Sequence, residues 1–455
     1  MIVMKFGGTS VESRKAIDRV AGIVRERIDQ HPVVVVSAMG KTTNKLLAIA
    51  ATAVKGERDR ATHALAELRE FHLHESHGLP VESAVQSHFE ELGELIKDLA
   101  ALGEFTPRAS DAVSSYGERL SSLIVASVFE DWGIDAVHLD SRRVIVTDDR
   151  HTQAAPIFAP TNARLEQIIP GLMRGPEPAN KRVIVMGGFM GATVDGVTTT
   201  LGRGGSDYTA SIVGSGIDAE EIQIWTDVDG MLTCDPTILE GGYRVKACSF
   251  AEAAELAYFG AKVLHPATVL PAIEKNIPVR ILNSRRPESE GTLIAEEAPD
   301  CADPIRSIAC KRNITLVNIV STRMLMAHGF LRRIFEVFDR FETPVDMLAT
   351  SEVSVSLTID NPRALAAIRA ELETFADVGI EEHHAILCLV GENIGRTPGV
   401  AARVFCALRD VNVRMVSQGA SLLNISLAVA SSDVRRAVES LHREFFANPD
   451  PAAFE

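Results

Sequence analysis

Apolar and polar positions follow a regular pattern over about the first 295 residues, and this pattern predicts a mixed α/β fold. Short apolar runs recur along the chain, and Val33–Val36 is apolar at four successive positions. Such runs favour strands that are buried on both faces of a largely parallel sheet. Apolar residues between the runs show the 3.6-residue spacing of helices. The predicted strands are Ile2–Lys5, Val33–Ser37, Ala136–Leu139, Arg182–Met186, Glu221–Trp225 and Val279–Leu282, and the predicted helices include Val11–Ile28, Tyr116–Phe129, Ser206–Gly214 and Ala251–Phe259.

Two stretches interrupt this alternation and indicate how the chain is organised. Residues 56–110 are charged and mainly helical in pattern, which indicates an insertion that covers one end of the sheet. Residues 285–303 are polar and contain Pro287 and Pro299, a composition typical of a domain boundary. We therefore expect one domain over residues 1–295.

Beyond this boundary the chain repeats itself at an offset of 70 residues. Gly329 maps onto Gly399, and Val355–Leu357 maps onto Ile425–Leu427. Each copy reads as a βαββαβ unit, whose sheet has open edges, so the two copies are expected to pair. The expected copies cover residues 304–380 and 381–455, and Ile305–Cys310 could belong to either.

Composition narrows the classes of function. The formal net charge of −15 disfavours nucleic acid or an anionic membrane as the main partner, and the aromatic content of 5% leaves few surfaces for base stacking. No stretch approaches the ~18 apolar residues of a membrane span, and the N-terminus lacks a signal pattern. The six cysteines form no C-x-x-C pair, which is typical of reduced thiols. We expect a cytoplasmic protein with no nucleic-acid partner and no membrane partner.

The first predicted strand ends in a cation followed by two glycines. Gly7 and Gly8 would let backbone N–H groups approach an anion closely, and Lys5 would add a compact point charge. If the next helix begins at Val11, its positive N-terminus faces the same anion. An ordinary strand-to-helix turn explains the same residues, so this motif alone does not distinguish an anion-binding site from such a turn.

Two further clusters carry polar side chains at the ends of predicted elements. Gly40-Lys41-Thr42 resembles the end of a phosphate-binding P-loop, but that loop needs a glycine where this chain has Val35. The hydroxyl and amide groups of Thr42–Asn44 could instead face a substrate, because ligands collect beyond the carboxyl ends of such strands. Glu118 stands beside a glycine in a predicted helix, where it could cap the helix or receive an ammonium group.

The densest cluster of glycines spans Met186–Gly191 and Thr198–Ala210. Arg203 lies between glycines, and its guanidinium suits the capture of a carboxylate or phosphate. Ser206 and Asp207 could merely cap the following helix, or Asp207 could hold Mg²⁺. The segment Trp225–Gly230 could hold ribose and adenine, and Phe259–Lys262 offers a second cation for a phosphate chain.

Taken together, these groups indicate phosphoryl transfer. Such chemistry depends mainly on positioning and on neutralising charge, and lysines, an arginine, glycine loops and single carboxylates supply both. The 13 histidines show no spacing typical of a metal site, and no Ser–His–Asp arrangement stands out.

The motifs also resemble those of one family, aspartate kinase. The resemblance covers essentially the whole chain and rests on KFGGTS at 5–10, TTN at 42–44, GER at 117–119, GRGGSDYTA at 202–210, WTDVDG at 225–230 and FGAKVLHPAT at 259–268. It implies a three-layer αβα sandwich of the amino-acid kinase type over residues 1–295, followed by two ferredoxin-like ACT domains. It also implies the transfer of a phosphoryl group from ATP to the side-chain carboxylate of L-aspartate. The product would be 4-phospho-L-aspartate, at the first step towards lysine, threonine and methionine.

The resemblance implies roles for individual residues. Lys5 and Asp207 are the expected catalytic residues, and Asp207 is the expected Mg²⁺ ligand. The residues expected to bind aspartate are Thr43, Glu118, Phe189, Arg203 and Ser206. The residues expected to bind ATP are Lys5, Phe6, Gly7, Gly8, Thr226, Asp227, Leu232, Thr237, Lys262 and Val263.

The ACT repeat implies feedback regulation by an amino acid and assembly into a homodimer or homotetramer. Lysine is the first candidate effector and threonine the second, and the repeat could also serve assembly alone. Met326 departs from the histidine common in lysine-sensitive relatives, whereas Asp346 and Glu352 match them and suit an ammonium group. The expected effector residues are Met324, Ala327, Gly329, Phe330, Leu331, Val345, Asp346, Thr350, Ser351 and Glu352. A non-catalytic amino-acid sensor and a kinase of another acid such as glutamate are the alternatives.

Overall fold

The structure is a computed structural model that describes residues 1–174, 181–260, 268–299, 301, 303–321 and 328–455. The chain divides into two compact units. The first comprises Met1–Gly230 and Val263–Glu297, and the second comprises Met231–Lys262 and Ala298–Glu455. None of the described helices combines the length and the hydropathy of a membrane span.

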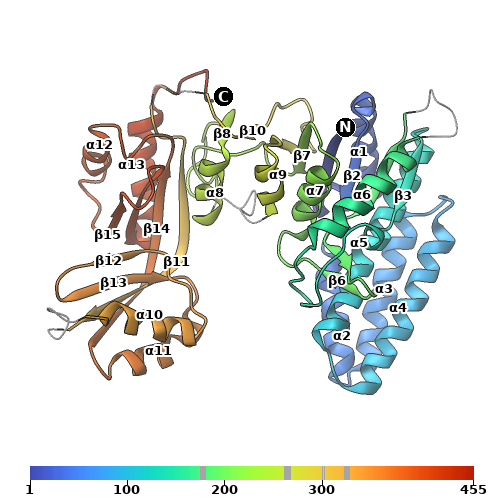
Figure 1. Ribbon diagram of the computed structural model, residues 1–455, viewed down its shortest axis with the longest axis horizontal. Helices are drawn as coiled ribbons and strands as arrows, with labels where there is room; N and C mark the ends of the chain where they lie inside the picture. Colours follow the sequence, from blue (N-terminus) through green and yellow to red (C-terminus); the bar gives the residue numbers. More distant parts are fainter. Residues whose placement is uncertain (175–180, 261–267, 300, 302, 322–327) are drawn as a thin grey trace. The chain divides into compact units, whose positions relative to one another are not determined.

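A largely parallel sheet forms the centre of the first unit (Figure 1). Each of the six predicted strands is present within one residue of its predicted bounds, so this part of the α/β prediction is confirmed. Strands β3, β4, β2, β1, β7 and β9 run parallel, and β10 adds to β9 in the antiparallel sense. In sheet order the strands are β3 (Ala136–Leu139), β4 (Val183–Gly187), β2 (Val33–Val36), β1 (Ile2–Phe6), β7 (Glu221–Thr226), β9 (Val279–Asn283) and β10 (Thr292–Ala295).

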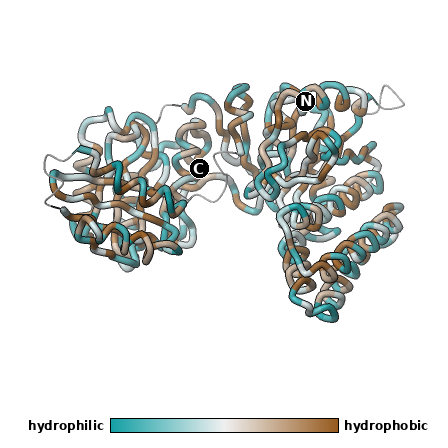
Figure 2. Tube along the Cα trace, turned by 60° about the horizontal axis from the view of Figure 1, so that its bottom comes forward, coloured by the Kyte–Doolittle hydropathy of each residue, from teal (hydrophilic) through white to brown (hydrophobic). Residues whose placement is uncertain are grey.

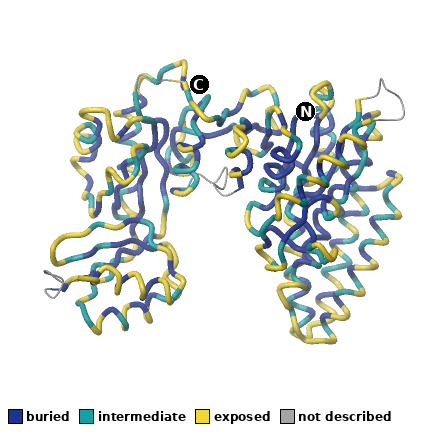
Figure 3. Tube along the Cα trace, in the orientation of Figure 1, coloured by how far each residue is buried: buried dark blue, intermediate teal, exposed yellow. Residues whose placement is uncertain are grey.

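Helices cover both faces of this sheet and complete the predicted three layers. Helices α1 (Arg14–Glu26) and α5 (Pro107–Asp131) pack on one face, and α6 (Phe158–Met173) and α7 (Gly205–Gly216) pack on the other. Alternation along β1 assigns its side chains to these layers. Ile2, Met4 and Phe6 enter the core that contains α1 and α5, whereas Lys5 reaches α7. Figure 3 shows the sheet strands as the buried centre of this unit.

Helix α1 begins later than the sequence predicts. A short 3₁₀ turn occupies Gly8–Ser10, and α1 starts at Arg14 instead of Val11. Ser13 is the N-cap, and its hydroxyl accepts a hydrogen bond from the N–H of Ala16 at 3.3 Å. The predicted start at Val11 is therefore wrong, because a capping serine fixes the start of α1 three residues further on.

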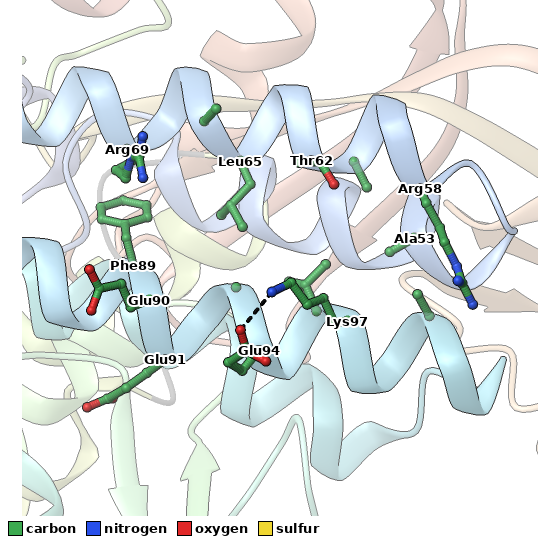
Figure 4. Close-up of a pocket in the computed structure, with 15 residues that line it drawn as sticks. Ala53, Arg58, Thr62, Leu65, Arg69, Phe89, Glu90, Glu91, Glu94 and Lys97 are labelled. Carbon is green, nitrogen blue, oxygen red and sulfur yellow. Dashed lines mark hydrogen bonds and ion pairs between the residues drawn. The ribbon is translucent and has the colours of Figure 1, made fainter.

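Three helices follow β2 and form an extension of the first unit. They are α2 (Thr42–Val54), α3 (Arg58–Glu75) and α4 (Glu82–Leu102), and α3 and α4 pack side by side (Figure 1). An apolar groove of about 840 Å³ lies along them, with Leu65 and Phe89 among its lining residues (Figure 4). Glu94 and Lys97 form an ion pair of 2.7 Å at its edge. Figure 2 shows hydrophobic and hydrophilic positions alternating along these helices, as expected for amphipathic helices.

An antiparallel sheet forms the centre of the second unit. Its strands, in sheet order, are β12 (Leu348–Thr350), β13 (Ser354–Ile359), β11 (Ser307–Val320), β14 (Asp377–Val390), β16 (Asn424–Ala430) and β15 (Val413–Gln418). Its helices are α10 (Phe330–Arg340), α11 (Leu365–Leu372), α12 (Val400–Ala407) and α13 (Val434–Phe446). The order βαββα occurs twice along the chain, from β11 to α11 and from β14 to α13, and the bounds of β14 lie 70 positions after those of β11. The last strand of each predicted ACT unit comes from the strand that begins the other copy.

Strands β11 and β14 each serve both copies of the repeat. Leu316–Val320 pair with Asp377–Glu381, which completes the first copy, and Ser307–Lys311 pair with Ile386–Val390 of the second. The register shifts between these halves, and Asn313 and His383 have positive φ angles of 61° and 62° there. The segment Ile305–Cys310, which the sequence left open, thus reaches β14 within the second copy.

The second unit also contains a short strand and helix from the middle of the chain. Strand β8 (Ala247–Ser249) leads into α8 (Phe250–Tyr258), close to the predicted helix Ala251–Phe259. The Ser249 hydroxyl accepts from the N–H of Glu252, and the Glu252 carboxylate accepts from the N–H of Ser249. This capping box fixes the start of α8.

Candidate active site

A cavity of about 270 Å³ lies at the carboxyl ends of β1 and β2 and at the N-terminus of α7. This is the edge of a parallel sheet where ligands usually bind. Six residues that the sequence analysis selected line it together: Lys5, Thr43, Glu118, Phe189, Ser206 and Asp207. The other lining residues are Ser37, Gly202, Gly204 and Gly205.

Lys5 and Asp207 form an ion pair within this cavity. The Nζ atom of Lys5 lies 2.6 Å from Oδ1 of Asp207, and both side chains are largely buried. Asp207 belongs to the first turn of α7, where the positive end of the helix stabilises a carboxylate. The pair thus holds a desolvated ammonium group in place, ready to neutralise an incoming anion.

Glu118 is a buried carboxylate without a cationic partner among the described residues. Its Oε1 atom accepts a hydrogen bond from the N–H of Ala38 at 3.2 Å, and its Oε2 atom is buried with no hydrogen-bond partner in the described part of the chain. Burial raises the pKa of Glu118 to about 8. An oxygen in this state favours a ligand that brings an ammonium group, because the new ion pair would offset the cost of burying the charge.

Close packing at Gly117 brings Thr43 next to Glu118. A Cβ atom at position 117 would lie 2.8 Å from Cβ of Ala38 and 3.2 Å from Oγ1 of Thr43. A larger residue would therefore push α5 away from the start of α2. The glycine of the GER motif is explained by this approach between two backbone segments.

The loop that precedes α7 is held by a residue in an unusual conformation. Phe189 has a φ angle of 65°, and its N–H donates to Oγ1 of Thr209 at 3.0 Å. Its ring lies against Gly205, where a Cβ atom would come within 2.7 Å of Phe189 Cδ2. A non-glycine residue at positive φ is strained and is found mostly at sites that need a defined geometry.

Arg203 does not line the cavity in this structure. Its side chain is exposed, while Gly202 and Gly204 on either side of it line the cavity with positive φ angles of 76° and 70°. The loop thus reaches the cavity through its glycines, and the role of Arg203 stays a prediction.

The expected phosphate donors at the N-terminal glycines are only partly available. The N–H of Gly7 donates to the carbonyl of Trp225 at 3.1 Å, so this group is already used within the sheet. A Cβ atom at Gly8 would lie 2.8 Å from the carbonyl oxygen of Gly40, which explains why glycine is required there. The side chain of Phe6 is fully buried and stacks on Trp225. Because this N–H is paired with Trp225, a phosphate at this loop would meet other groups first, and nucleotide binding at Gly7 stays a prediction.

The residues expected to contact the nucleoside lie in both units. In the first unit, Thr226 ends β7 and its hydroxyl donates to the exposed Asp227 at 3.3 Å. In the second unit, Leu232 is half-buried, and Thr237 is exposed and donates twice to Oδ1 of Asp235. Lys262 and Val263 lie outside the described residues.

The donor set at the cavity fits Mg²⁺ bound together with a nucleotide. The described residues contain no group of three or more His, Cys, Asp or Glu side chains arranged to hold a metal by themselves. Mg²⁺ commonly keeps several waters and binds one or two carboxylates together with substrate phosphates. Asp207, beside Lys5 in the cavity, offers such a carboxylate.

Asp346, the expected effector ligand, is buried in the second unit and already carries a cation. Its Oδ1 atom lies 2.5 Å from Nζ of Lys311 and accepts from the hydroxyl of Tyr258 at 3.2 Å. Lys311 also contacts Oδ2 of Asp360 at 2.9 Å. Oδ2 of Asp346 is buried without a hydrogen-bond partner in the described ranges, and burial raises the pKa of this carboxyl. The sequence analysis did not identify Lys311 as part of this site.

The other expected effector residues occupy several elements. Thr350, Ser351 and Glu352 are exposed where β12 ends and turns towards β13, whereas Asp346 precedes β12. Gly329 caps α10 with a φ angle of 80°. Phe330 is buried, Leu331 is 38% exposed and Val345 is half-buried. Met324 and Ala327 lie outside the described residues.

Sequence reasoning also missed residues of the cavity itself. Ser37 follows β2 directly, and its place at a strand end was the signal that could have identified it. Gly202, Gly204 and Gly205 belong to the GRGGSDYTA motif, and it is their backbone that lines the cavity, which the motif alone does not predict. Asp111 lies outside the cavity lining and gave no sequence signal, since its contacts come from distant segments.

Comparison with known proteins places this arrangement in a family. The model of the amino acid kinase family matches residues 1–283, and an ACT domain model matches residues 387–445. The chain is 41% identical to aspartokinase 3, chloroplastic, of Arabidopsis thaliana over 98% of its own length and 81% of that protein. It is 36% identical to lysine-sensitive aspartokinase 3 of Escherichia coli, over 98% and 99% of the two chains.

A solved structure gives the same result at the level of the fold. The structure of E. coli aspartokinase III in complex with aspartate and ADP superposes with a TM-score of 0.83 and 35% sequence identity. The match covers 98% of this chain and 100% of that one. The chain belongs to the amino acid kinase family, and within that family to the aspartokinases.

Proposed function

We propose that this protein transfers the γ-phosphoryl group of ATP to the side-chain carboxylate of L-aspartate and so forms 4-phospho-L-aspartate. The observation that carries the proposal is the cavity that combines the Lys5–Asp207 pair with the unpartnered carboxylate of Glu118. The related E. coli structure holds aspartate and ADP, which supports both substrates. The reaction is a step of amino-acid biosynthesis.

Charge neutralisation is the main catalytic task in this cavity. The substrate is an anion that must approach an anionic phosphate, and Lys5 lowers this repulsion because its ammonium group is held at the reacting end by Asp207. No general base is required, since an aspartate carboxyl with a pKa near ~3.9 is ionised at neutral pH. Asp207 would also hold Mg²⁺, which supplies further positive charge to the phosphates when bound.

Recognition of aspartate follows from the opposite charges of its two backbone groups. Glu118 binds the α-ammonium through its free oxygen, and Arg203 binds the α-carboxylate once its exposed side chain turns towards the substrate. Thr43 and Ser206 donate hydroxyl hydrogen bonds, and Phe189 closes the apolar side of the pocket.

The nucleotide is assigned to the residues that the family resemblance selected. Thr226, Asp227, Leu232 and Thr237 would contact the nucleoside, and Lys262 with Val263 would hold the phosphate end, together with the backbone around Phe6, Gly7 and Gly8. Catalysis is assigned to residues 1–295 and regulation to residues 304–380 and 381–455.

Lysine is proposed as the feedback inhibitor, with threonine as the second candidate. A relative is named lysine-sensitive, which supports the first choice. Asp346 has the buried, unpartnered oxygen that an ammonium group requires. The exposed turn at Thr350–Glu352 would contact the same effector, with Gly329, Phe330, Leu331 and Val345 around it.

An ADP-release assay with Mg·ATP and L-aspartate, with and without lysine and threonine, tests these assignments together. The expected result is turnover that depends on L-aspartate and that one of the two amino acids suppresses. Folded protein that releases no ADP with L-aspartate, or that prefers L-glutamate, would contradict the proposed reaction. Turnover that neither lysine nor threonine suppresses would contradict the proposed regulation alone.

Assembly through the ACT repeat is proposed from its exposed apolar residues. Phe335 on α10 and Phe405 on α12 occupy equivalent positions of the two copies and are 39% and 41% exposed. Exposed apolar side chains of this kind are commonly covered in assemblies. Sedimentation velocity should show a dimer or tetramer that Phe335→Glu together with Phe405→Glu dissociates. A monomeric wild-type protein would refute the proposal.

A further inference from the structure

A buried carboxylate that the proposed mechanism does not use lies seven residues before Glu118 on the same helix. Asp111 is fully buried, and its hydrogen-bond partners come from two segments, residues 151–152 and the strand Thr198–Thr200. Its Oδ1 atom accepts from the hydroxyl of Thr200 at 2.5 Å and from the N–H of Thr152 at 3.0 Å. Its Oδ2 atom lies 2.7 Å from Nδ1 of His151. A buried carboxylate needs hydrogen-bond donors of this kind, and here its hydrogen bonds hold the segments that supply the donors next to α5.

One of these partners is held in a strained backbone conformation. Thr152 has a φ angle of 72°, a region that β-branched residues rarely adopt. Both carboxylate oxygens of Asp111 accept from its N–H, at 3.0 and 3.1 Å. A strained conformation of this kind persists only where surrounding contacts hold the residue in it, and such residues cluster at functional sites.

The same segments adjoin the glycine loop of the cavity. Thr200 is the last residue of β6 (Thr198–Thr200), directly before Leu201 and the loop that begins at Gly202. The carbonyl of Thr200 accepts from the N–H of Ala154 at 2.9 Å. A Cβ atom at Gly202 would lie 3.1 Å from the carbonyl oxygen of Thr152, so the strained turn touches the loop. Asp111 therefore fixes both the start of the loop and the turn on which Gly202 rests.

We propose that Asp111 is a positioning residue that sets the place of the Gly202–Gly204 loop, and thereby of Arg203, in the aspartate subsite. It acts through Thr200 and through the strained turn at Thr152, and it does not itself line the cavity. This inference rests on the proposed aspartate kinase function. It predicts that loss of the Asp111 hydrogen bonds weakens the binding of aspartate and leaves the binding of ATP unchanged.

Steady-state kinetics of Asp111→Asn test the inference in the full-length protein. The amide has one acceptor atom where the carboxylate has two, so the loop loses part of its anchor. The KM for L-aspartate should rise by about tenfold or more, because small displacements of a positioning group are costly, while the KM for ATP stays within about twofold. Asp131→Asn, at the exposed end of the same helix, is the matched control and should leave both KM values unchanged.

A rescue experiment separates positioning from a general loss of stability. Glycine adopts positive φ without strain, so Thr152→Gly in the Asp111→Asn background should restore at least part of the aspartate KM. Equal rises of both KM values, or a lack of rescue, would overturn the inference. If Asp111→Asn does not fold, Thr200→Val decides the question, since it removes one hydroxyl donor and should raise the aspartate KM alone. Wild-type protein without aspartate-dependent turnover would instead overturn the proposed function.

Discussion

Two buried carboxylates, Glu118 in the first unit and Asp346 in the second, show how differently this chain treats the same kind of group. Burial raises the pKa of both, and each has one oxygen without a hydrogen-bond partner in the described residues. Glu118 receives one backbone N–H, whereas Asp346 receives the ammonium of Lys311 and the hydroxyl of Tyr258. In the proposed function a ligand supplies the cation for Glu118, whereas a cationic effector at Asp346 would compete with Lys311 of the chain itself.

In the second copy of the repeat, the ion pair that corresponds to Lys311 and Asp346 has its charges reversed. Glu381 stands 70 positions after Lys311. Val413-Arg414-Met415 stands 68 positions after Val345-Asp346-Met347 and corresponds to it by strand register, because Met347 pairs with Thr358 and Met415 with Ala428, the residue 70 positions after Thr358. Glu381 pairs with Arg414, whose side chain is 41% exposed, whereas the side chain of Asp346 is 2% exposed. An ammonium effector therefore fits the first copy, and the equivalent place in the second copy presents a cation.

The largest effect is expected from removing the cation that the chain does supply to the catalytic cavity. Lys5→Ala should lower kcat by about a thousandfold, because it removes the charge that neutralises the transferring phosphoryl group and leaves Asp207 unpaired. The ADP-release assay measures this effect, and circular dichroism checks the fold. Lys15→Ala, at an exposed position of α1, is the matched control. Retention of most activity in Lys5→Ala would refute the assignment of Lys5.

The next largest effect is expected on the KM for L-aspartate when Glu118, the carboxylate without a cationic partner among the described residues, is replaced. Glu118→Gln should raise the KM for L-aspartate by about ten- to a hundredfold, since the amide cannot pair with the α-ammonium. Because the pKa of Glu118 is raised to about 8, the carboxylate forms as the pH rises, and kcat/KM for aspartate should increase from about pH 7 to about pH 9.

The pH dependence gives Glu118 a specific signature. In Glu118→Gln the rise in kcat/KM should vanish, whereas Glu130→Gln, at the exposed end of the same helix, should keep it. An unchanged pH profile in Glu118→Gln would show that another group binds the ammonium.

A smaller effect is expected on inhibition by lysine when the pair between Lys311 and Asp346 is changed. Lys311→Met removes the competing ammonium, so the lysine concentration for half-inhibition should fall several-fold, provided that the protein folds. Breaking a buried pair costs about 3–5 kcal/mol of stability, which thermal unfolding with and without lysine would measure. Asp346→Ala is the matched variant and should abolish inhibition by lysine. If Asp346→Ala leaves the inhibition unchanged, the proposed effector site is wrong.

The smallest effect is expected from the reversed pair of the second copy. Glu381→Gln should change the free energy of unfolding by about 1 kcal/mol or less, because the pair is partly exposed and screened by solvent. Lysine inhibition should be the same as in the wild-type protein. A large loss of inhibition would show that both copies bind the effector, and the comparison between them would fail.

Much of the fold was readable from local pattern. The apolar run Val33–Val36 predicts a central strand of a parallel sheet, and β2 is buried at every position. The repeat offset of 70 residues predicts two related units, and β11 and β14 obey it. Such features follow from periodicity, since side-chain direction is fixed by the local backbone.

Other features depend on contacts between distant segments and were missed or misplaced. The N–H of Gly7 is used by Trp225, and Lys311 neutralises Asp346, although neither partner is near in sequence.

The start of α1 was misplaced for a different reason. It lies at Arg14 because Ser13 caps the helix, a local signal that the hydrophobic pattern does not contain.

The sequence by itself determined the order of the elements, the family motifs and the residues available for phosphoryl transfer. The tertiary structure alone decided which of these residues meet, and with what charge and solvation. Folding buries Glu118 without a cation, which is why we propose it as the ammonium ligand, whereas Asp346 is buried beside Lys311. Charge balance at a buried site is a property of all the segments that enclose it, and no single segment encodes it.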